Sequence, residues 1–358
     1  MLVMSSKEYL KNLFDSAVED HVFPGYSAAI VTSSEILTFW GGTHTYDKGS
    51  LPVHESTLYD VASLTKIVGP MTVMMRLVDS GEISLDDKIS KYLPSFSNDP
   101  YKSLTTIRHL LTYTIDYDLP EGAKSFMKNT SPKELAIRMM ELPFKSFPAK
   151  TYIYTNITAF LLTQLIEQIT NKNFYDLVKE RVFIPCNMST ATFFPNEDEK
   201  TLIPPTENID ERGLVQGFVH DEMTFYLQSG GISCGAAGLF ASAKDMANFF
   251  STALTFTPNK KPLFSNEMLR NFTSNQFDSL LPTITPLGWG DLNNDLISTH
   301  SKYFVVKGGF TGCFMIVDIK NKLGVVLLSN AIYPMRPKDR AAFNQLKTKI
   351  FNLLLSNA

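Results

Sequence analysis

Apolar residues along this chain of 358 residues follow either the spacing of a helix or the short runs of a strand, and the strand pattern occurs near both ends. A helical pattern begins at Ser6, and two runs at 26–32 and 36–40 then have the composition and length of strands joined by a hairpin. Late in the chain the pattern predicts three further strands and a closing helix, at 304–306, 313–318, 324–328 and about 338–355.

The middle of the chain, from about Gly81 to Phe194, is mainly helical in pattern. Ser131 and Glu134 form a capping box with proline at the first helical position, which predicts a helix through Glu141. Further helices are expected at 157–169, at 174–182 and from the cap Ser242 to Leu254, whereas 195–235 is expected to form mixed loops.

Strands at both ends with helices between them predict an α/β chain of the α+β kind. One sheet is assembled from the two ends of the chain, is flanked by helices and carries an all-helical insertion. We expect residues 1–80 and 236–358 to form the sheet domain and residues 81–235 the inserted helical domain. Two structural units also fit a chain of this length.

Composition narrows the class of protein. Hydrophobic residues make up 44% and charged residues 19%, which is typical of a globular protein with a large core, and the net charge of −3 gives no support for binding nucleic acid. The three cysteines, Cys186, Cys234 and Cys313, are too widely spaced for a disulfide framework or a metal site, which fits a reducing compartment.

Several functional classes lack their sequence signals. The first residues have no signal-peptide pattern, and no run of about 18 apolar residues occurs, so we expect a cytoplasmic protein without a membrane span. No glycine-rich phosphate loop or dinucleotide motif lies at a strand–helix junction. We therefore expect no cofactor and no metal. The sequence gives no indication of the oligomeric state.

The sequence Ser63-Leu64-Thr65-Lys66 is the strongest chemical signal in the chain. If Ser63 opens a helix, the Lys66 amine lies on the same face and can take the proton of the serine hydroxyl. The helix N-terminus favours the negative charge that develops when Ser63 attacks a carbonyl. By itself the pattern occurs by chance in many chains, where it is more often a capping serine followed by a solvated lysine.

Two further motifs follow at a suitable order and distance: Tyr154-Thr155-Asn156 and Lys307-Gly308-Gly309. With the first motif, they resemble the three motifs of the serine beta-lactamase and penicillin-binding-protein superfamily. Other segments resemble the branch that contains class C beta-lactamase relatives and family-VIII-type esterases. These segments are Thr106 to Thr112, Phe183 to Met188, Val219 to Glu222, Ala237 to Phe240 and Leu328 to Asn330.

The resemblance implies an antiparallel sheet beside a helical region, with the active site in the cleft between them. Ser63 would be the nucleophile, Lys66 the base, and Tyr154 a phenol that shares the proton when nearby lysines lower its pKa. Alternatives remain: Tyr152 is close to Tyr154 in sequence, and Asn156 has the position of a helix cap.

The resemblance also gives roles to substrate-binding residues. Asn156 would hold Lys66 or a substrate amide, and Lys307, Gly308 and Gly309 would form the edge strand of the cleft. The backbone N–H groups of Ser63 and Phe310 would form the oxyanion hole. Gly308 replaces the frequent threonine, whose hydroxyl contacts a substrate carboxylate, and this favours an ester substrate.

These residues predict a serine hydrolase that forms an acyl-enzyme on Ser63. The expected activity is that of a carboxylesterase acting on small acyl esters. A beta-lactamase, a D-peptidase or an amidase would use the same mechanism on a beta-lactam or peptide-like substrate. A noncatalytic, penicillin-binding or ligand-sensing relative is the alternative from another class. The presence of Ser63, Lys66, Tyr154, Asn156 and Lys307 disfavours it.

A second serine motif competes with Ser63. Gly231 to Gly235 contains Ser233 in the G-x-S-x-G pattern of alpha/beta-hydrolases, but no convincing buried strand precedes it, and His300 is the only histidine that follows. Ser233 is therefore expected to be a loop residue. His220-Asp221 lacks the companions of a metal site and is expected to be a hydrogen-bonded structural pair bordering the cleft.

Overall fold

The computed structural model describes residues 2–119, 127, 129–256, 261–271, 274–277, 286–288 and 304–356. His300 lies outside the described residues. Within the described parts, no helix has both the length and the apolar character needed to cross a membrane. The expected cytoplasmic location stays a prediction.

Five strands form one antiparallel sheet from the two ends of the chain, in the order β2-β1-β9-β8-β7. The N-terminal part supplies β1 (Gly25–Val31) and β2 (Ile36–Gly42); the C-terminal part supplies β7 (Phe304–Gly308), β8 (Phe314–Asp318) and β9 (Leu323–Ser329). The predicted α+β class and the sheet assembled from both ends are confirmed.

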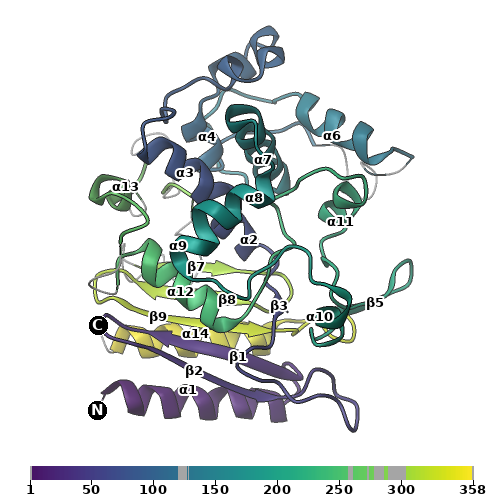
Figure 1. Cartoon of the computed structure of the whole chain (residues 1–358), viewed down its shortest axis with the longest axis vertical. Coiled ribbons are helices and arrows are strands. Elements are labelled where there is room, and N and C mark those ends of the chain that lie inside the picture. The colour runs from purple at the N-terminus through teal and green to yellow at the C-terminus, as the bar shows by residue number, and fades with distance from the viewer. Residues whose placement is uncertain are drawn as a thin grey trace.

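Helices cover both faces of this sheet, which explains why all seven residues of β1 are buried. On one face lie α1 (Leu2–Glu19) and α14 (Ala341–Ser356), as Figure 1 shows. Phe14 of α1 and Phe351 of α14 belong to the same apolar cluster as Leu327 of β9. The opposite face carries α12 (Ala243–Ala253) and the helical body.

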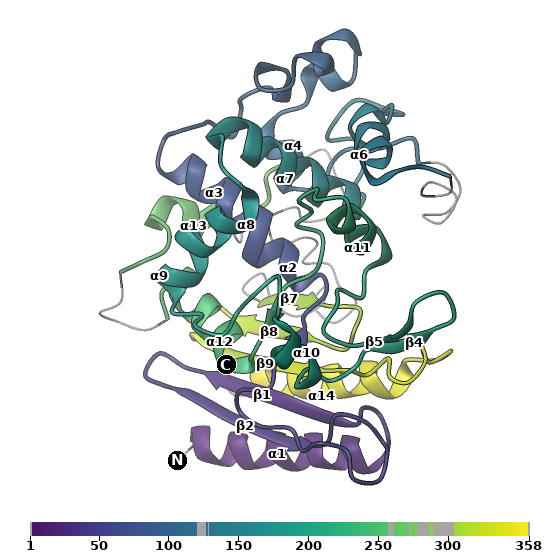
Figure 2. The same cartoon turned by 45° about the vertical axis from the view of Figure 1, so that its right-hand side comes forward.

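The helical body stands above that second face in both views (Figures 1 and 2). Its central helix, α7 (Asn156–Thr170), is apolar almost all round and is buried along most of its length. The helices α4 (Ile107–Leu111), α6 (Pro132–Glu141) and α8 (Phe174–Val178) pack against it. The described chain also forms α9 (Ile184–Cys186), α11 (Glu222–Ser229) and α13 (Asn266–Asn271). Shorter helical segments are also present. They are the helix α10 (Glu197–Thr201), three 3-10 turns (Ile89–Lys91, Pro94–Asn98 and Lys102–Leu104) and a π-helical segment (Lys179–Phe183).

The helix that follows Ser63 changes its winding. It consists of α2 (Leu64–Lys66), a π-helical segment (Ile67–Met71) and α3 (Thr72–Asp79). Pro70 lies in the π-helical segment and lacks the N–H of a regular turn, while the Thr72 hydroxyl donates to the Ile67 carbonyl at 2.6 Å. The irregular winding begins after Lys66, so the turn from Ser63 to Lys66 is retained.

The predicted domain division at residues 1–80, 81–235 and 236–358 stays a prediction. The segment from Ile67 to Asp79 contacts α7 and α8, and one apolar core cluster extends from the sheet into the helical body. The helix after Ser63 therefore packs with the predicted insertion as well as with the sheet domain.

The expectation of mixed loops at 195–235 is wrong in part. This stretch contains α10, the hairpin β4 (Glu207–Ile209) and β5 (Gly213–Val215), and α11. The Asp221 side chain accepts from Thr224 N–H and so caps α11. The sequence prediction paired Asp221 with His220 and therefore did not identify Asp221 as a helix cap.

Candidate active site

Ser63 lies between the sheet and the helical body, just after the short strand β3 (Tyr59–Asp60), which pairs with β6 (Phe240–Ala241). It occupies the N-cap position of α2, but its side chain makes no capping hydrogen bond. The Lys66 ammonium lies 3.0 Å from Ser63 Oγ and donates to the Ala236 carbonyl at 2.7 Å. Lys66 is only 1% exposed, so the alternative of a capping serine with a solvated lysine is wrong.

Tyr154 completes a cluster with two lysines. The ammonium of Lys66 is 5.4 Å and that of Lys307 is 4.0 Å from the centroid of its ring. Burial acts to raise the pKa of Tyr154, but the charges of Lys307 and Lys66, with hydrogen bonds to Ser63 and Lys66, outweigh it and lower the pKa to about 8. Tyr154 therefore ionises more readily than an ordinary tyrosine.

Tyr152, the alternative in sequence, has a different environment. Its ring packs edge-on against Tyr113, with the centroids 6.1 Å apart. Tyr154 is the tyrosine that lies beside Lys66 and Lys307, which agrees with the predicted assignment.

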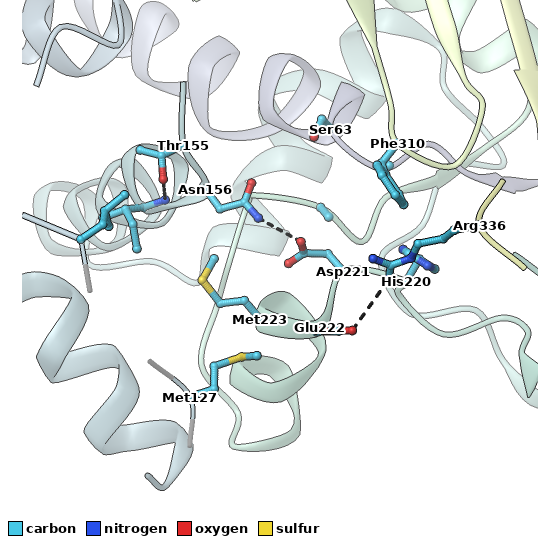
Figure 3. A pocket seen from close by; sticks show the side chains of 14 residues that line it. Ser63, Met127, Thr155, Asn156, His220, Asp221, Glu222, Met223, Phe310 and Arg336 are labelled. Atoms are coloured by element: carbon cyan, nitrogen blue, oxygen red, sulfur yellow. Dashed lines mark hydrogen bonds and ion pairs between the residues drawn. The ribbon is translucent and has the colours of Figure 1, made fainter. Parts of the chain in front are cut away.

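Asn156 is held differently from the expectation. Its amide nitrogen donates to Asp221 Oδ2 at 2.9 Å (Figure 3). The cap of α7 is Thr155, whose side chain accepts from Ile157 N–H, so the alternative of Asn156 as the helix cap is wrong. The structure thus gives Asn156 a carboxylate partner that sequence spacing did not reveal.

The two glycines after Lys307 have different surroundings. A Cβ atom on Gly309 would lie 2.4 Å from the Val61 carbonyl oxygen, so this position requires glycine for close packing. A Cβ atom on Gly308 would meet only ordinary contacts, the nearest being Lys347 Nζ at 3.8 Å on α14. A side chain at position 308 would extend toward α14, so the missing threonine hydroxyl gives no support for the expected ester preference. That preference stays a prediction.

Phe310 forms a wall of the site. Its ring is 44% exposed, stacks on His220 with the centroids 5.7 Å apart, and has the Arg336 guanidinium 5.0 Å from its centroid. The N–H groups of Ser63 and Phe310 have no acceptor among the described residues. Both groups therefore remain available to a ligand.

A cavity of about 540 Å³ opens in front of Ser63. Figure 3 shows Ser63 and Phe310 at its upper side and Met127 and Met223 at the lower left. Its lining is mixed apolar and polar and consists of Ala62, Ser63, Leu119, Met127, Thr155, Asn156, Ile157, His220, Asp221, Glu222, Met223, Ala237, Phe310 and Arg336.

Arg336 is a lining residue that sequence reasoning missed. Its guanidinium lies 2.8 Å from Glu207 and 3.7 Å from Glu222. Its sequence neighbourhood contains no motif that indicates a site, and its position results from long-range pairing with Glu207 after β9. The wall therefore carries Asp221 and Glu222 beside an arginine that already has acidic partners.

Two other sequence expectations can be compared with the structure. Ser233 is a loop residue, as predicted: it follows α11, and its hydroxyl donates to Glu167 at 2.7 Å. His220 and Asp221 border the cavity, but the pairing expected between them is wrong, because His220 bonds Glu207 at 2.8 Å. Within the described ranges, no three potential metal ligands come together.

Comparison with known proteins decides the family, because the beta-lactamase family model matches residues 10–349. The chain belongs to the beta-lactamase family. Members of this family are serine hydrolases, and this protein is one of them. A relative from Escherichia coli K12 named putative D-alanyl-D-alanine carboxypeptidase is 26% identical, over 86% of this chain and 78% of its own length.

Solved structures agree with the family fold. EstCE1, described as a hydrolase with promiscuous acyltransferase activity, matches with a TM-score of 0.76 at 16% identity over 98% of this chain and 99% of its own. A beta-lactamase/D-alanine carboxypeptidase from Pseudomonas syringae matches with a TM-score of 0.75 at 17% identity, over 98% of this chain and 99% of its own. At these identities the likeness shows the fold alone.

Proposed function

We propose that the enzyme hydrolyses small acyl esters through an acyl-enzyme on Ser63. The observation that carries this proposal is the position of Lys66, which is buried and bridges Ser63 Oγ and the Ala236 carbonyl. A desolvated amine beside a serine hydroxyl is suited to take its proton. Tyr154, with its pKa lowered to about 8, supports the same transfer.

In acylation, the coupled pair of Lys66 and Tyr154 acts in the form that has lost one proton, either as amine and phenol or as ammonium and phenolate. Ser63 Oγ attacks the substrate carbonyl carbon, and its proton passes to this pair. The N–H groups of Ser63 and Phe310 stabilise the oxyanion. The ester C–O bond then breaks, and the same proton passes to the leaving-group oxygen. In deacylation a water molecule attacks the acyl carbonyl, and Ser63 regains its proton as the acid leaves.

The wall of the cavity supports a preference for uncharged esters. Asp221 and Glu222 face the space in front of Ser63, and Arg336 already pairs with Glu207 and Glu222. A substrate carboxylate placed there meets like charges, which disfavour its binding. Leu119, Met127 and Met223 offer apolar contact to a short acyl chain.

A peptidase or beta-lactamase activity is the second candidate. It is favoured by the carboxypeptidase names of the relatives and by Asn156, whose side chain lines the cavity where a substrate amide would bind. The mechanism on Ser63 would be the same. The two candidates differ in leaving group and in the charge of the substrate.

Covalent labelling tests the proposal. The enzyme is incubated with a fluorophosphonate, p-nitrophenyl butyrate and a penicillin, followed by intact mass and mapping of the modified residue. We expect the fluorophosphonate on Ser63, turnover of the ester, and loss of both in Ser63→Ala. Ser233→Ala is the matched control and should keep both activities.

An active Ser63→Ala variant beside an inactive Ser233→Ala variant would overturn the assignment of the nucleophile. A folded enzyme that binds penicillin without any adduct or turnover would support the noncatalytic, ligand-sensing alternative instead. Penicillin turnover without ester turnover would favour the beta-lactamase candidate.

A further inference from the structure

Asp60 is a buried carboxylate without an assigned role in the reaction. It ends β3 and is 2% exposed. One carboxylate oxygen accepts the N–H of Ala62 at 2.8 Å and the other accepts the N–H of His220 at 2.7 Å. Asp60 thus joins the segment before Ser63 to the wall of the cavity that contains His220.

The bond to Ala62 constrains the backbone directly before the nucleophile. The backbone of Ala62 has a φ of 47°, in the left-handed region that residues other than glycine rarely adopt. The carboxylate of Asp60 holds the Ala62 N–H in this conformation. Because the next peptide group carries the Ser63 N–H, the direction of that N–H depends on the turn that Asp60 fixes.

The backbone carbonyl of Asp60 makes a third connection. It accepts the Thr311 hydroxyl at 2.7 Å, and Thr311 is completely buried in the turn between β7 and β8. Gly309 in the same turn packs so closely on Val61 that a Cβ atom would lie 2.4 Å from the Val61 carbonyl oxygen. Phe310, between Gly309 and Thr311, is therefore docked at both sides onto the segment that contains Asp60.

We infer that Asp60 is a positioning residue that sets the distance and direction between the N–H groups of Ser63 and Phe310. The inference rests on the proposed function, in which these two groups form the oxyanion hole. Asp60 does not touch the substrate in this scheme. It acts through Ala62 and His220 on one side and through Thr311 on the other.

The chemistry of the side chain fits this role. An ionised carboxylate only accepts hydrogen bonds, so it can take one N–H on each oxygen. An asparagine of the same shape offers one oxygen and an NH₂ group, which faces the second N–H without being able to accept it. Burial raises the pKa of Asp60, and the hydrogen bonds from His220 and Ala62 oppose that effect.

The test compares Asp60→Asn with Asp245→Asn. Asp245 is equally buried at 2% and caps α12 in a box with Ser242, but it does not line the cavity. Five quantities are measured in both variants: kcat and KM for p-nitrophenyl butyrate, affinity for a butyl boronic acid that mimics the tetrahedral intermediate, fluorophosphonate labelling, and Tm.

For Asp60→Asn we expect kcat to fall at least tenfold, toward the roughly hundredfold loss seen when one oxyanion donor is removed, with KM changed less than twofold. Boronate affinity should fall by a similar factor, because the boronate oxygen occupies the same hole. Asp245→Asn should lower Tm while kcat and boronate affinity stay within twofold.

A second variant keeps the inference testable if Asp60→Asn does not fold. Thr311→Val removes only the hydroxyl that donates to the Asp60 carbonyl, and we expect kcat and boronate affinity to fall together by about threefold or more. Unchanged boronate affinity in the folded variants, with only Tm lowered, would overturn the inference. Failure of the unmodified enzyme to label at Ser63 would instead overturn the proposed function.

Discussion

The Lys307 ammonium lies 4.0 Å from the centroid of the Tyr154 ring, and this contact joins the C-terminal strand β7 to the loop before α7. Lys66 approaches the same ring from α2 at 5.4 Å. Three segments far apart in the sequence therefore place two positive charges on one phenol. The low pKa of Tyr154 is a property of this assembly and not of any one segment.

This arrangement predicts a pH dependence. Positive charge favours the phenolate, so ester acylation should rise with pH through an apparent pKa near 8. Lys307→Gln removes one charge, which should move the midpoint upward toward the ordinary tyrosine value of about 10 and lower the rate at pH 7. Stopped-flow acylation rates from pH 6 to 10 measure this shift.

Lys307→Arg is the control for charge and should keep the midpoint close to that of the unmodified enzyme. Tyr154→Phe should lose the rising limb. A midpoint that stays in place when the charge of Lys307 is removed would contradict the electrostatic coupling of Lys307 and Tyr154.

Lys66→Ala should lower the acylation rate at least about a hundredfold, since a positioned general base is removed. Lys66→Arg should be nearly as slow, because guanidinium stays protonated at the working pH. Loss of the bond to the buried Ala236 carbonyl should also cost about 1–3 kcal/mol of stability, so rates are measured well below the Tm of each variant.

Lys102→Ala is a matched control for the burial of a lysine. Lys102 is 6% exposed and donates to the Met140 carbonyl at 3.3 Å, in a part of the helical body that does not line the cavity. Its loss should lower stability but not acylation. If Lys66→Arg acylates at the normal rate, Lys66 acts electrostatically and the base lies elsewhere.

Gly308, the last residue of β7, and Gly309, which follows it, should respond differently to alanine. Gly309→Ala places a methyl group against the Val61 backbone, and overpacking of this kind costs about 1–3 kcal/mol. It should also reduce kcat/KM by more than tenfold, because the adjoining Phe310 N–H is displaced. Gly308→Ala has room and should keep kcat/KM within about twofold; equal behaviour of the two variants would argue against the close packing. Ester kinetics and thermal unfolding measure both effects.

Substrate preference is predicted from the charge of the cavity wall. The unmodified enzyme should have a higher kcat/KM for p-nitrophenyl butyrate than for nitrocefin, which carries a carboxylate. Glu222→Gln removes a negative charge from the wall, and we expect it to raise kcat/KM for nitrocefin about fivefold, equivalent to about 1 kcal/mol, with little effect on the ester.

Glu197→Gln is the control, because Glu197 pairs with Lys200 on exposed α10 and does not line the cavity. It removes the same charge from the protein and should leave both substrates unchanged. Efficient nitrocefin turnover by the unmodified enzyme, with negligible ester turnover, would reject the esterase proposal.

Local signals in the sequence were sufficient for much of the fold. The capping boxes at Ser131 and Ser242 define helices whose first residues agree with the structure, because the cap and the turn it satisfies lie within four residues. The hairpin β4–β5 was missed, since its strands are only three residues long and show no alternating pattern.

The candidate site also has a part that the sequence predicted and a part that it did not. The motifs containing Ser63, Lys66, Tyr154 and Lys307 were predicted to meet, and the structure brings them together. The bonds from Asn156 to Asp221 and from His220 N–H to Asp60 join distant segments. No spacing in a single sequence specifies such pairs, because each depends on how the loops dock after the sheet has formed.

The pairing of β1 with β9 has a consequence for synthesis on the ribosome. The hairpin of β1 and β2 leaves the ribosome long before β9, the strand that pairs with the other edge of β1. Until β9 is released, one edge of that hairpin lacks its partner, and Ser63 is without the strand that carries Lys307. A nascent chain therefore holds its nucleophile long before it can use it, and hydrolytic activity should arise only after β7 and β9 have been released.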